Sequence, residues 1–537
     1  MTTIVARTWD SREQLHAGGP LTRYTSFHNS STACTEETPH PTEFRPLNLS
    51  ESRAAISEPF SSSSLPPSLA PGRSAAAFTA RARVDDAGPS FLPGGHASPE
   101  LLGLLRGRGH PRAPGPVTNK RIAVVGGGIA GLSAAWALSN RAHVTLFEAA
   151  PRAGGHTNTV DVTLDGVTQG VDTGFLVFNE RTYPLLIQLF AQLGIATAKS
   201  DMSFSAQVMR DGIEWSGSSL ATVFAQRRNL LRPAFWGMLA DLLRFNRLCT
   251  VLATSGEEAA LGEPIGDFLA RHRFGRGFRD WYLLPMVACI WSCPTAQMLQ
   301  FPIRTLIRFC HNHGLLQVND RPQWWTVSGG ARHYVEALLP AIHEVRLNTA
   351  AQAIHRPAAG GDVVVQSPRG REHFDAVILA GHSDQSLALL AAPTDVEHQV
   401  LSAIRYQPNV AVLHTDAALL PRRRAAWAAW NYESGGNGSA VCLHYLLNRL
   451  QPLPWQQPVI VSLNPLREPD PARVIGRYDY AHPVFDDGAV RAQARLPSIQ
   501  GGGGVWFAGA WARYGFHEDG LLSGLQAAQG VIDKVLA

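Results

Sequence analysis

A glycine-rich turn that begins at Gly126 is the strongest chemical feature of the sequence. Its spacing, G-x-G-x-x-G, lies between an apolar run at 122–125, which predicts a buried strand, and small residues at 132–138, which predict a helix. Such a turn lets the backbone approach a pyrophosphate, and the start of the helix favours phosphate because its N–H groups are unpaired. The sequence therefore predicts a dinucleotide site formed by Gly126, Gly128, Ile129, Ala130 and Gly131.

An acid follows this turn at the distance that a dinucleotide-binding unit requires. The apolar run at 144–147 predicts a second strand, and Glu148 and Ala149 come directly after it. Glu148 lies about 20 residues beyond the turn, where a carboxylate can accept a hydrogen bond from the ribose of an adenosine group. A plain glycine-rich turn would not need this acid, so we expect both residues at the adenosine end of the site.

Four side chains are candidates for proton transfer at a reacting centre: His156, His313, His517 and Glu518. Histidine exchanges protons near neutral pH, and a carboxyl group can be tuned to do so. His517 and Glu518 belong to the stretch YGFHEDG at 514–520, which we expect to be a loop before a helix at 521–536. A structural hydrogen bond is the alternative role for each candidate, and the sequence leaves open which of them acts.

Composition narrows the class of protein. The 537 residues carry a net charge of only +4, and no block of like charges favours nucleic acid as a partner. The six scattered cysteines include no C-x-x-C pair, so we expect reduced thiols in a cytoplasmic protein and no metal site. No apolar run reaches the roughly 18 residues of a membrane span, and the N-terminus lacks the apolar core of a secretory signal.

Two features between residues 230 and 325 allow two interpretations each. Apolar residues at helical spacing in 230–252 predict a helix, and arginines lie along it. This helix could make a peripheral contact with an anionic membrane, or it could simply present a solvated face, which is the interpretation we favour. Aromatic residues such as Trp281, Trp291 and Trp324 could line an apolar substrate cavity or belong to an ordinary core.

The first 118 residues differ from the rest. Residues 1–118 are rich in Ser, Pro, Ala, Gly and Thr, and no hydrophobic period persists in them. Such a segment buries too little apolar surface to offset its loss of conformational entropy, so we expect a disordered, low-complexity extension. A transit peptide and a misplaced start are the alternatives.

Two further stretches resemble a known family. Arg152-Ala153-Gly154-Gly155-His156 is similar to the R-x-G-G stretch of the flavin amine oxidase and phytoene desaturase superfamily, and 504–537 resembles the terminal FAD motif of that superfamily. The resemblance spans 119–537. The stretches at 312–316 and 514–520 resemble a bacterial subgroup described as predicted NAD/FAD-binding, amine-oxidase-like proteins, whose genes often lie beside those for cyclopropane fatty-acyl synthases.

The resemblance implies an α/β fold. It consists of a Rossmann-like FAD-binding domain, discontinuous as in glutathione reductase, with an inserted α+β substrate domain. The three FAD-binding parts are expected at 119–198, 325–395 and 499–537. The substrate domain is expected to have a mainly helical part at 199–324 and a sheet-bearing part at 396–498.

The resemblance also implies which residues contact the cofactor. In the family the arginine and the glycine pair lie along the FAD pyrophosphate and the flavin, and the last helix points its dipole at the flavin. The matching positions here are Arg152, Gly154, Gly155, His156, Gly174, Phe175, Val345, Gly509, Ala510, Gly520 and Leu521, with Val345 beside the adenine.

Three departures from the family pattern affect the expected chemistry. Ala510 stands where the family commonly has an acid, so one FAD contact must come from elsewhere. The only lysines, Lys120, Lys199 and Lys534, lie outside the regions that could supply the active-site lysine of many amine oxidases. No cysteine follows Cys442, so the cysteine that tethers flavin in some relatives is missing and FAD should bind non-covalently.

The resemblance therefore implies an FAD-dependent oxidoreductase. We expect it to take hydride onto flavin N5 from an apolar substrate such as a fatty-acyl chain, in a desaturase-like reaction. An amine or amino-acid oxidase is the first alternative, although the missing lysine counts against it. A flavoprotein without net redox turnover is the second.

Overall fold

The computed structural model describes residues 98–105, 118–291, 294–317, 321–357, 361–435 and 442–537. These residues belong to one compact unit. The disorder that we expect for 1–97 lies outside the described residues.

A short helix contradicts the predicted N-terminal extension. Helix α1 (Pro99–Leu105) buries Leu101, Leu104 and Leu105 in the same apolar cluster as α3 (Pro184–Leu193) and α16 (His517–Val531). The prediction that all of 1–118 lacks structure is therefore wrong for α1. Its apolar residues have helical spacing, but one short run does not stand out within a polar segment.

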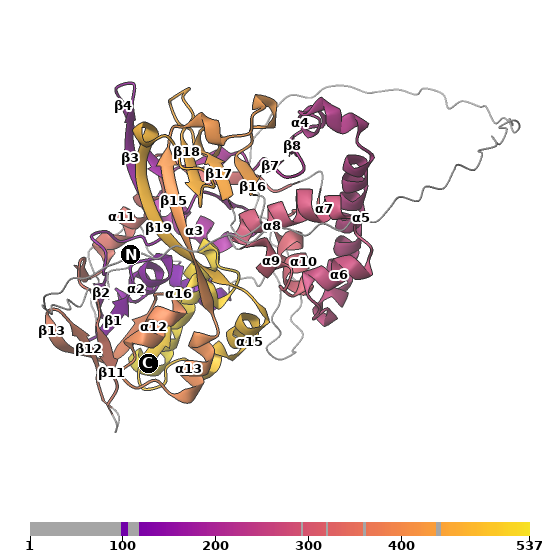
Figure 1. Cartoon of the computed structure of the whole chain (residues 1–537). Helices are drawn as coiled ribbons and strands as arrows, with labels where there is room; N and C mark the ends of the chain where they lie inside the picture. The colour runs from indigo at the N-terminus through magenta and orange to yellow at the C-terminus, as the bar shows by residue number, and fades with distance from the viewer. Residues whose placement is uncertain (1–97, 106–117, 292–293, 318–320, 358–360, 436–441) are drawn as a thin grey trace, which may run out of the picture. The chain divides into compact units, whose positions relative to one another are not determined.

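A five-stranded parallel sheet forms the centre of the fold (Figure 1). Its strand order, β10-β2-β1-β14-β20, draws on well separated parts of the chain. The strands are β1 (Arg121–Val125), β2 (His143–Phe147), β10 (Glu344–Arg346), β14 (Ala376–Leu379) and β20 (Val505–Phe507). This arrangement confirms the predicted α/β class. The order reverses at β1, the place where sheets of this kind bind their ligands beyond the carboxyl ends of the strands.

Successive side chains of a strand point to opposite faces of the sheet, and in this protein both faces are covered by other elements. Ile122 and Val124 pack with α2 (Ile129–Leu138), α3, α11 (Arg332–Leu338) and α16. Ala123 packs on the opposite face, which is covered by an antiparallel sheet and two helices. These elements are β11 (Ala353–His355), β12 (Val363–Ser367), β13 (Gly370–Phe374), α12 (Ser383–Leu389) and α13 (Asp395–Ser402).

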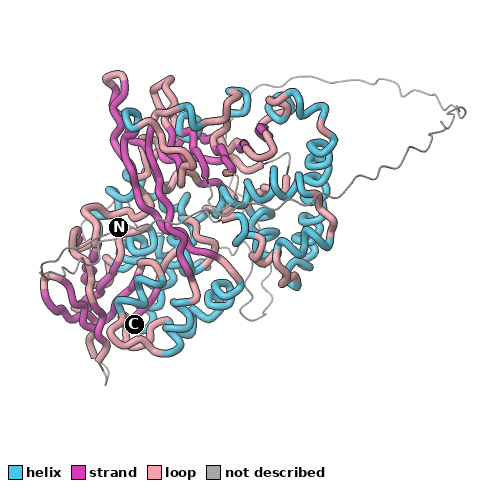
Figure 2. Tube along the Cα trace, in the orientation of Figure 1, coloured by secondary structure: helices cyan, strands magenta, loops and turns pink. Residues whose placement is uncertain are grey.

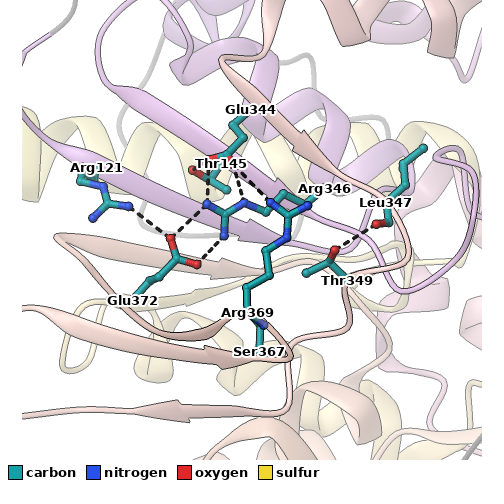
Figure 3. A network of polar contacts seen from close by, with 9 residues as sticks. All are labelled: Arg121, Thr145, Glu344, Arg346, Leu347, Thr349, Ser367, Arg369 and Glu372. Carbon is teal, nitrogen blue, oxygen red and sulfur yellow. Dashed lines mark hydrogen bonds and ion pairs between the residues drawn. The ribbon is translucent and has the colours of Figure 1, made fainter.

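An arginine at the sheet edge ties β10 to β13 (Figure 3). The buried Arg346 donates to Glu344 at 2.7 and 2.8 Å and to Glu372 at 3.0 Å. The carbonyl oxygen of Arg346 also accepts the N–H of Glu148 at 2.9 Å. The network therefore holds Val345 on β10 next to the end of β2, where Glu148 lies.

A second sheet has seven strands in the order β19-β15-β18-β17-β16-β7-β8. β15 (Arg405–His414), β16 (Trp430–Ser434), β17 (Cys442–Leu446), β18 (Ile460–Leu463) and β19 (Val474–Val484) fall in the predicted sheet-bearing part at 396–498. β7 (Phe204–Val208) and β8 (Ile213–Ser216) lie in the part at 199–324 that we expect to be mainly helical. The long pair β15 and β19 extends from this sheet to the region of α12 and α16 (Figure 1; Figure 2).

A helical layer follows β8 in the chain. Its main helices are α5 (Pro233–Ser255), α6 (Ile265–Arg271), α7 (Arg276–Phe278), α8 (Leu284–Trp291) and α10 (Ile303–Asn312). Helix α5 confirms the helix predicted at 230–252. Among the described helices, none is long and apolar enough to cross a membrane.

Candidate active site

The glycine-rich turn leaves open space beyond the carboxyl end of β1. A Cβ added at Gly128 would meet no atom within 4 Å, whereas one added at Gly131 would lie 1.8 Å from the carbonyl oxygen of Gly126. Gly131 is thus needed for close packing, and Gly128 keeps the space in front of α2 clear. No side chain caps the start of α2, so its first N–H groups are available to an anion.

Glu148 holds the side of this turn. The N–H of Gly127 donates to Oε2 at 2.7 Å, and the N–H of Ala150 donates to Oε1 at 2.7 Å. The carboxylate remains half-buried at the end of β2, with Ala149 exposed beside it. This is the position in which the sequence predicts an acid for the adenosine ribose.

The glycine pair Gly154 and Gly155 lies beside the same open space. The N–H of Gly154 donates to the carbonyl oxygen of Gly127 at 2.7 Å, which joins the two glycine segments. Gly155 has a φ of 57°, and a Cβ there would lie 3.1 Å from the Cα of Gly128. Arg152 stabilises the bend by donating to Thr157 O at 2.9 Å and to Gly155 O at 3.1 Å.

The last helix begins earlier than the sequence predicts. Helix α16 starts at His517, so the expectation of a loop through Gly520 is wrong. Asp519 accepts the N–H of Phe516 at 3.0 Å, and acids in a first turn are favoured by the helix dipole. A Cβ added at Gly520 would lie 2.8 Å from Ile129 Cγ2, which places the starts of α2 and α16 side by side.

His517 is held by contacts on several sides. Its Nε2 lies 2.7 Å from Tyr334 Oη and 3.1 Å from Thr157 Oγ1, and its ring stacks on Phe175 with centroids 3.8 Å apart. Burial lowers the pKa of His517 to about 3, so the ring is neutral. The engaged Nε2 favours a positioning role that ties α16 to Phe175 and to the glycine pair.

Glu518 caps another helix. Its two oxygens accept the N–H groups of Leu185 at 2.8 Å and Leu186 at 2.9 Å, at the start of α3. Burial raises the pKa of Glu518 to about 8, while the two backbone donors act in the opposite direction. A carboxyl group occupied in this way favours the structural alternative over proton transfer.

His156 lies among rings that come from distant parts of the chain. It stacks on Tyr480 with centroids 5.0 Å apart, and its centroid lies 5.3 Å from that of His482 and 6.5 Å from that of His382. Its Nε2 is buried without a hydrogen-bond partner among the described residues. Burial, assisted by His382 and Arg152, lowers the pKa of His156 to about 4. The ring is therefore a neutral base.

Three members of this group are absent from the sequence-based list: His382, Tyr480 and His482. His382 follows the carboxyl end of β14, a position that the binding rule for parallel sheets marks. Tyr480 and His482 lie two residues apart on β19, so an alternating strand pattern was the available signal. Burial lowers the pKa of His482 to about 3, and Asn409 Nδ2 lies 2.8 Å from its Nδ1.

His313 lies apart from this group, within an aromatic cluster. Its ring stacks on Phe309 with centroids 3.9 Å apart, and its Nδ1 lies 3.0 Å from the carbonyl oxygen of Phe309. Phe309 lies 4.9 Å from Trp291 and 5.2 Å from Phe516 between ring centroids. Burial lowers the pKa of His313 to about 4. The cluster therefore joins α8 and α10 to the residue that precedes α16.

Comparison with known proteins identifies the family of the chain and with it the dinucleotide cofactor. Residues 129–417, more than half of the chain, match the family described as "Flavin containing amine oxidoreductase". The chain belongs to this family. The cofactor of this oxidoreductase is therefore FAD, as the two glycine segments and α16 predict.

Relatives of this oxidoreductase carry varied names. It is 28% identical over 300 residues to "Carotenoid phi-ring synthase" of Streptomyces griseus, covering 51% of this chain and 54% of that protein. It is 28% identical over 186 residues to "Protoporphyrinogen oxidase 2, chloroplastic/mitochondrial" of Arabidopsis thaliana, covering 32% of each. The chain thus spans about half or less of the length of these curated relatives.

Solved structures share the fold at lower identity. The "CLA-producing fatty acid isomerase from P. acnes" matches with a TM-score of 0.55 and 16% identity, over 78% of this chain and 99% of that one. "Cyclohexylamine Oxidase from Brevibacterium oxydans" matches with a TM-score of 0.56 and 16% identity, over 78% and 100% of the two chains. At this identity the likeness concerns the fold alone.

The described residues fit FAD. The open space at Gly128, the uncapped start of α2 and the carboxylate of Glu148 suit the phosphates and the ribose. A Cβ at Gly174 would lie 2.2 Å from the carbonyl oxygen of His156, so the two segments that would pass the flavin lie in contact. Individual cofactor contacts, including those of Val345, Gly509, Ala510 and Leu521, remain predictions, as does non-covalent binding.

The three lysines lie at the surface of the oxidoreductase. Lys120 pairs with Asp375 at 2.7 Å, and Lys534 donates to the carbonyl oxygen of Gln500 at 3.3 Å. The side chain of Lys199 is exposed on β6 (Thr197–Ser200). An amine oxidase mechanism that depends on a buried lysine therefore has no candidate here.

A polar cluster in the seven-stranded sheet joins Glu433, Cys442 and His444, with donor atoms within 4.8 Å of one another. This set could suit zinc, but a hydrogen-bond chain also accounts for it. A backbone N–H donates to His414 Nδ1, so His414 Nε2–H donates to Ser462 Oγ at 2.7 Å and Ser462 donates to His444 Nδ1 at 2.6 Å. Nε2–H of His444 then donates to Glu433 at 3.1 Å. This proton arrangement leaves no lone pair on His444 for a metal.

Glu148 provides a test of the cofactor site. We expect Glu148→Ala to weaken FAD binding by about 1.5–3 kcal/mol, because a charged hydrogen-bond acceptor for the ribose is lost. Titration of the apoprotein with FAD, followed by flavin fluorescence, measures the change. Glu468→Ala removes an exposed acid and serves as the control. Unchanged affinity in Glu148→Ala would mean that another group holds the ribose.

Proposed function

We propose that this oxidoreductase removes hydrogen from an apolar substrate, such as a fatty-acyl chain, in a desaturase-like reaction. Bound FAD would supply the hydride acceptor at N5. The substrate would lose hydride from one carbon and a proton from its neighbour, which leaves a C=C bond. A base must therefore take the proton, and we assign this role to His156 because its buried Nε2 has no hydrogen-bond partner in the part of the chain that the structure describes.

One observation carries the choice of an apolar substrate: aromatic rings lead up to the start of α16. Trp291, Phe309 and Phe516 form a row with centroid separations of 4.9 and 5.2 Å, and Phe516 directly precedes His517. Apolar side chains of this kind are what a hydrocarbon chain would pack against. Burial keeps His313 neutral, so the histidine beside this row adds no charge at neutral pH.

Nearby carboxyl groups give little support to the amine oxidase alternative. Asp172 accepts the N–H of Ala331 at 3.0 Å and the side chain of Gln451 at 2.8 Å. Glu518 caps α3, and Asp519 accepts the N–H of Phe516. These three carboxyl groups are thus engaged by the protein, whereas a substrate ammonium would need a free one.

The names of the similar proteins include at least one for each of the three candidate functions. Two are named for carotenoid and fatty acid, and one solved structure is an amine oxidase. The name of the fatty acid isomerase is consistent with the third candidate, a redox-neutral reaction on an apolar chain.

Anaerobic mixing of the FAD-loaded protein with candidate substrates tests the proposal. We expect acyl lipids to bleach the visible absorbance of the oxidised flavin, because hydride reduces the flavin. Amines such as putrescine and cyclohexylamine should leave it unchanged. Bleaching by amines alone would favour the amine oxidase, and turnover of lipid without bleaching would favour the redox-neutral reaction.

A further inference from the structure

One face of the helical layer carries an unusual share of exposed apolar residues. Of the twelve large hydrophobic residues that are exposed in the described chain, five lie between positions 230 and 251. We call this surface the α5 outer face. Its apolar members are Leu230, Leu231, Trp236, Leu243 and Val251.

The helical period places these residues on one side of α5. Trp236, Leu243 and Val251 are 50%, 58% and 56% exposed, and their spacings of seven and eight residues bring them onto one stripe. The opposite stripe, which includes Phe235 and Phe245, is buried against the core. Figure 1 shows α5 at the edge of the drawn elements, with α7, α8 and α10 on its inner side.

The turn before α5 adds a protruding apolar corner. Leu231 is 87% exposed, and Leu230 beside it is also exposed, in a 3₁₀ turn (Arg227–Leu231) directly before α5. Trp236 Nε1 donates to the carbonyl oxygen of Leu230 at 3.0 Å, which orients the indole beside this corner. An amphipathic ring of this kind is typical of a membrane interface.

The charge of the same segment is strongly positive. Residues 217–254 contain five arginines and one acid, a net charge of +4 that equals the net charge of all 537 residues. The acid, Asp241, is engaged by Arg244 at 2.8 Å and by the N–H of Gly275 at 2.7 Å. Arg227 and Arg247 are exposed and have no ion pair or hydrogen bond with described residues. The outer face therefore offers unpaired cations beside apolar side chains.

From these observations we infer that the α5 outer face docks on the surface of an anionic lipid bilayer. Apolar side chains would enter the headgroup boundary while arginines meet lipid phosphates. A second copy of the chain would bring a like-charged face against this one, so charge complementarity favours the anionic bilayer. The surface belongs to the same helical layer as the aromatic row, because α5 packs on α10, whose Phe309 contacts Phe516 before α16.

The purpose of such docking, the supply of an apolar substrate, rests on the proposed function. Docking itself does not require turnover, so the two ideas can fail separately. Vesicle binding without flavin bleaching by lipid would support the docking surface and contradict the proposed lipid substrate. Bleaching by dispersed lipid without vesicle binding would do the reverse.

Flotation with vesicles tests the inference on the full FAD-loaded chain. We expect binding to phosphatidylcholine vesicles that contain phosphatidylglycerol, weaker binding to pure phosphatidylcholine, and loss of binding as salt is raised. Leu231→Ser with Trp236→Ser, and separately Arg227→Gln with Arg247→Gln, should each weaken binding by on the order of tenfold or more. Flavin absorbance should stay unchanged, and the melting temperature should fall only slightly, because these side chains lie at the surface and Trp236 loses a single hydrogen bond.

Val396→Ser with Arg495→Gln provides the matched control, since it removes one exposed apolar residue and one exposed arginine elsewhere. Equal weakening by this control, or binding that ignores lipid charge, would overturn the inference. The same holds if wild-type protein ignores vesicles and instead forms a dimer that Leu231→Ser with Trp236→Ser dissociates. Light scattering after gel filtration detects such a dimer.

Discussion

Replacing His156 by Ala should slow reduction of the flavin by substrate about 10²–10⁴-fold while FAD stays bound, as expected for loss of a general base. The reason is the buried Nε2 of His156, which has no hydrogen-bond partner among the described residues. Stopped-flow absorbance on FAD-loaded protein measures the rate. His373→Ala removes an exposed histidine on β13 and should reduce at the wild-type rate.

The pH dependence provides a second readout of the same residue. Only the neutral imidazole can accept a proton, and burial lowers the pKa of His156 from its usual 6.5 to about 4. The wild-type rate should therefore stay level as pH falls through 6.5 and drop only as pH approaches about 4. His156→Ala should lack this drop. A wild-type rate in His156→Ala would move the role of base to His517 or His313.

Removing the side chain of His517 or Glu518 should have a different effect from His156→Ala, namely a loss of stability and of FAD together. Because they join α16 to Tyr334 and to the start of α3, their loss would disturb the fold around the flavin. A variant that keeps FAD and melting temperature but loses the rate would restore a direct catalytic role for them.

The largest stability effect should come from Gly524→Ala. A Cβ at Gly524 would lie 2.1 Å from the carbonyl oxygen of Ala130 and 2.3 Å from Ser133 Oγ, so α16 and α2 would have to separate. We expect a loss of about 3 kcal/mol or more in the free energy of unfolding, because a backbone atom cannot move aside as a side chain can. FAD should be released as well, since both helices begin at its site.

Gly237→Ala is the matched control for this substitution. Gly237 also lies within a helix, but a Cβ there would meet no atom within 4 Å. Alanine should therefore stabilise α5 by about 0.5–1 kcal/mol. Thermal melting and flavin release measure both variants. A wild-type melting temperature for Gly524→Ala would show that α16 can shift without cost.

The sequence alone determined the cofactor-binding half of the molecule. The turn at Gly126, the acid at Glu148 and the glycine pair at Gly154 are local patterns, because each part of a strand–turn–helix unit is specified by neighbouring residues. Their spacing was therefore sufficient to predict the strands β1 and β2, the helix α2 and a dinucleotide site, whereas the rest of the fold was implied by the family resemblance. The hairpin of β3 (Thr159–Leu164) and β4 (Val167–Asp172) is a local pattern as well, since Asp165 and Gly166 form its turn.

Tertiary structure decided what surrounds the reacting centre. His156 meets Tyr480 and His482 only because β19 pairs with β15 and extends to the glycine segments, a contact between residues more than 300 positions apart. Glu518 has the composition of a catalytic acid, yet the packing of α16 on α3 makes it a helix cap. Helical spacing alone also could not show which side of α5 faces outward. Each of these outcomes depends on long-range packing, which determines burial and partners and is not encoded in any local window.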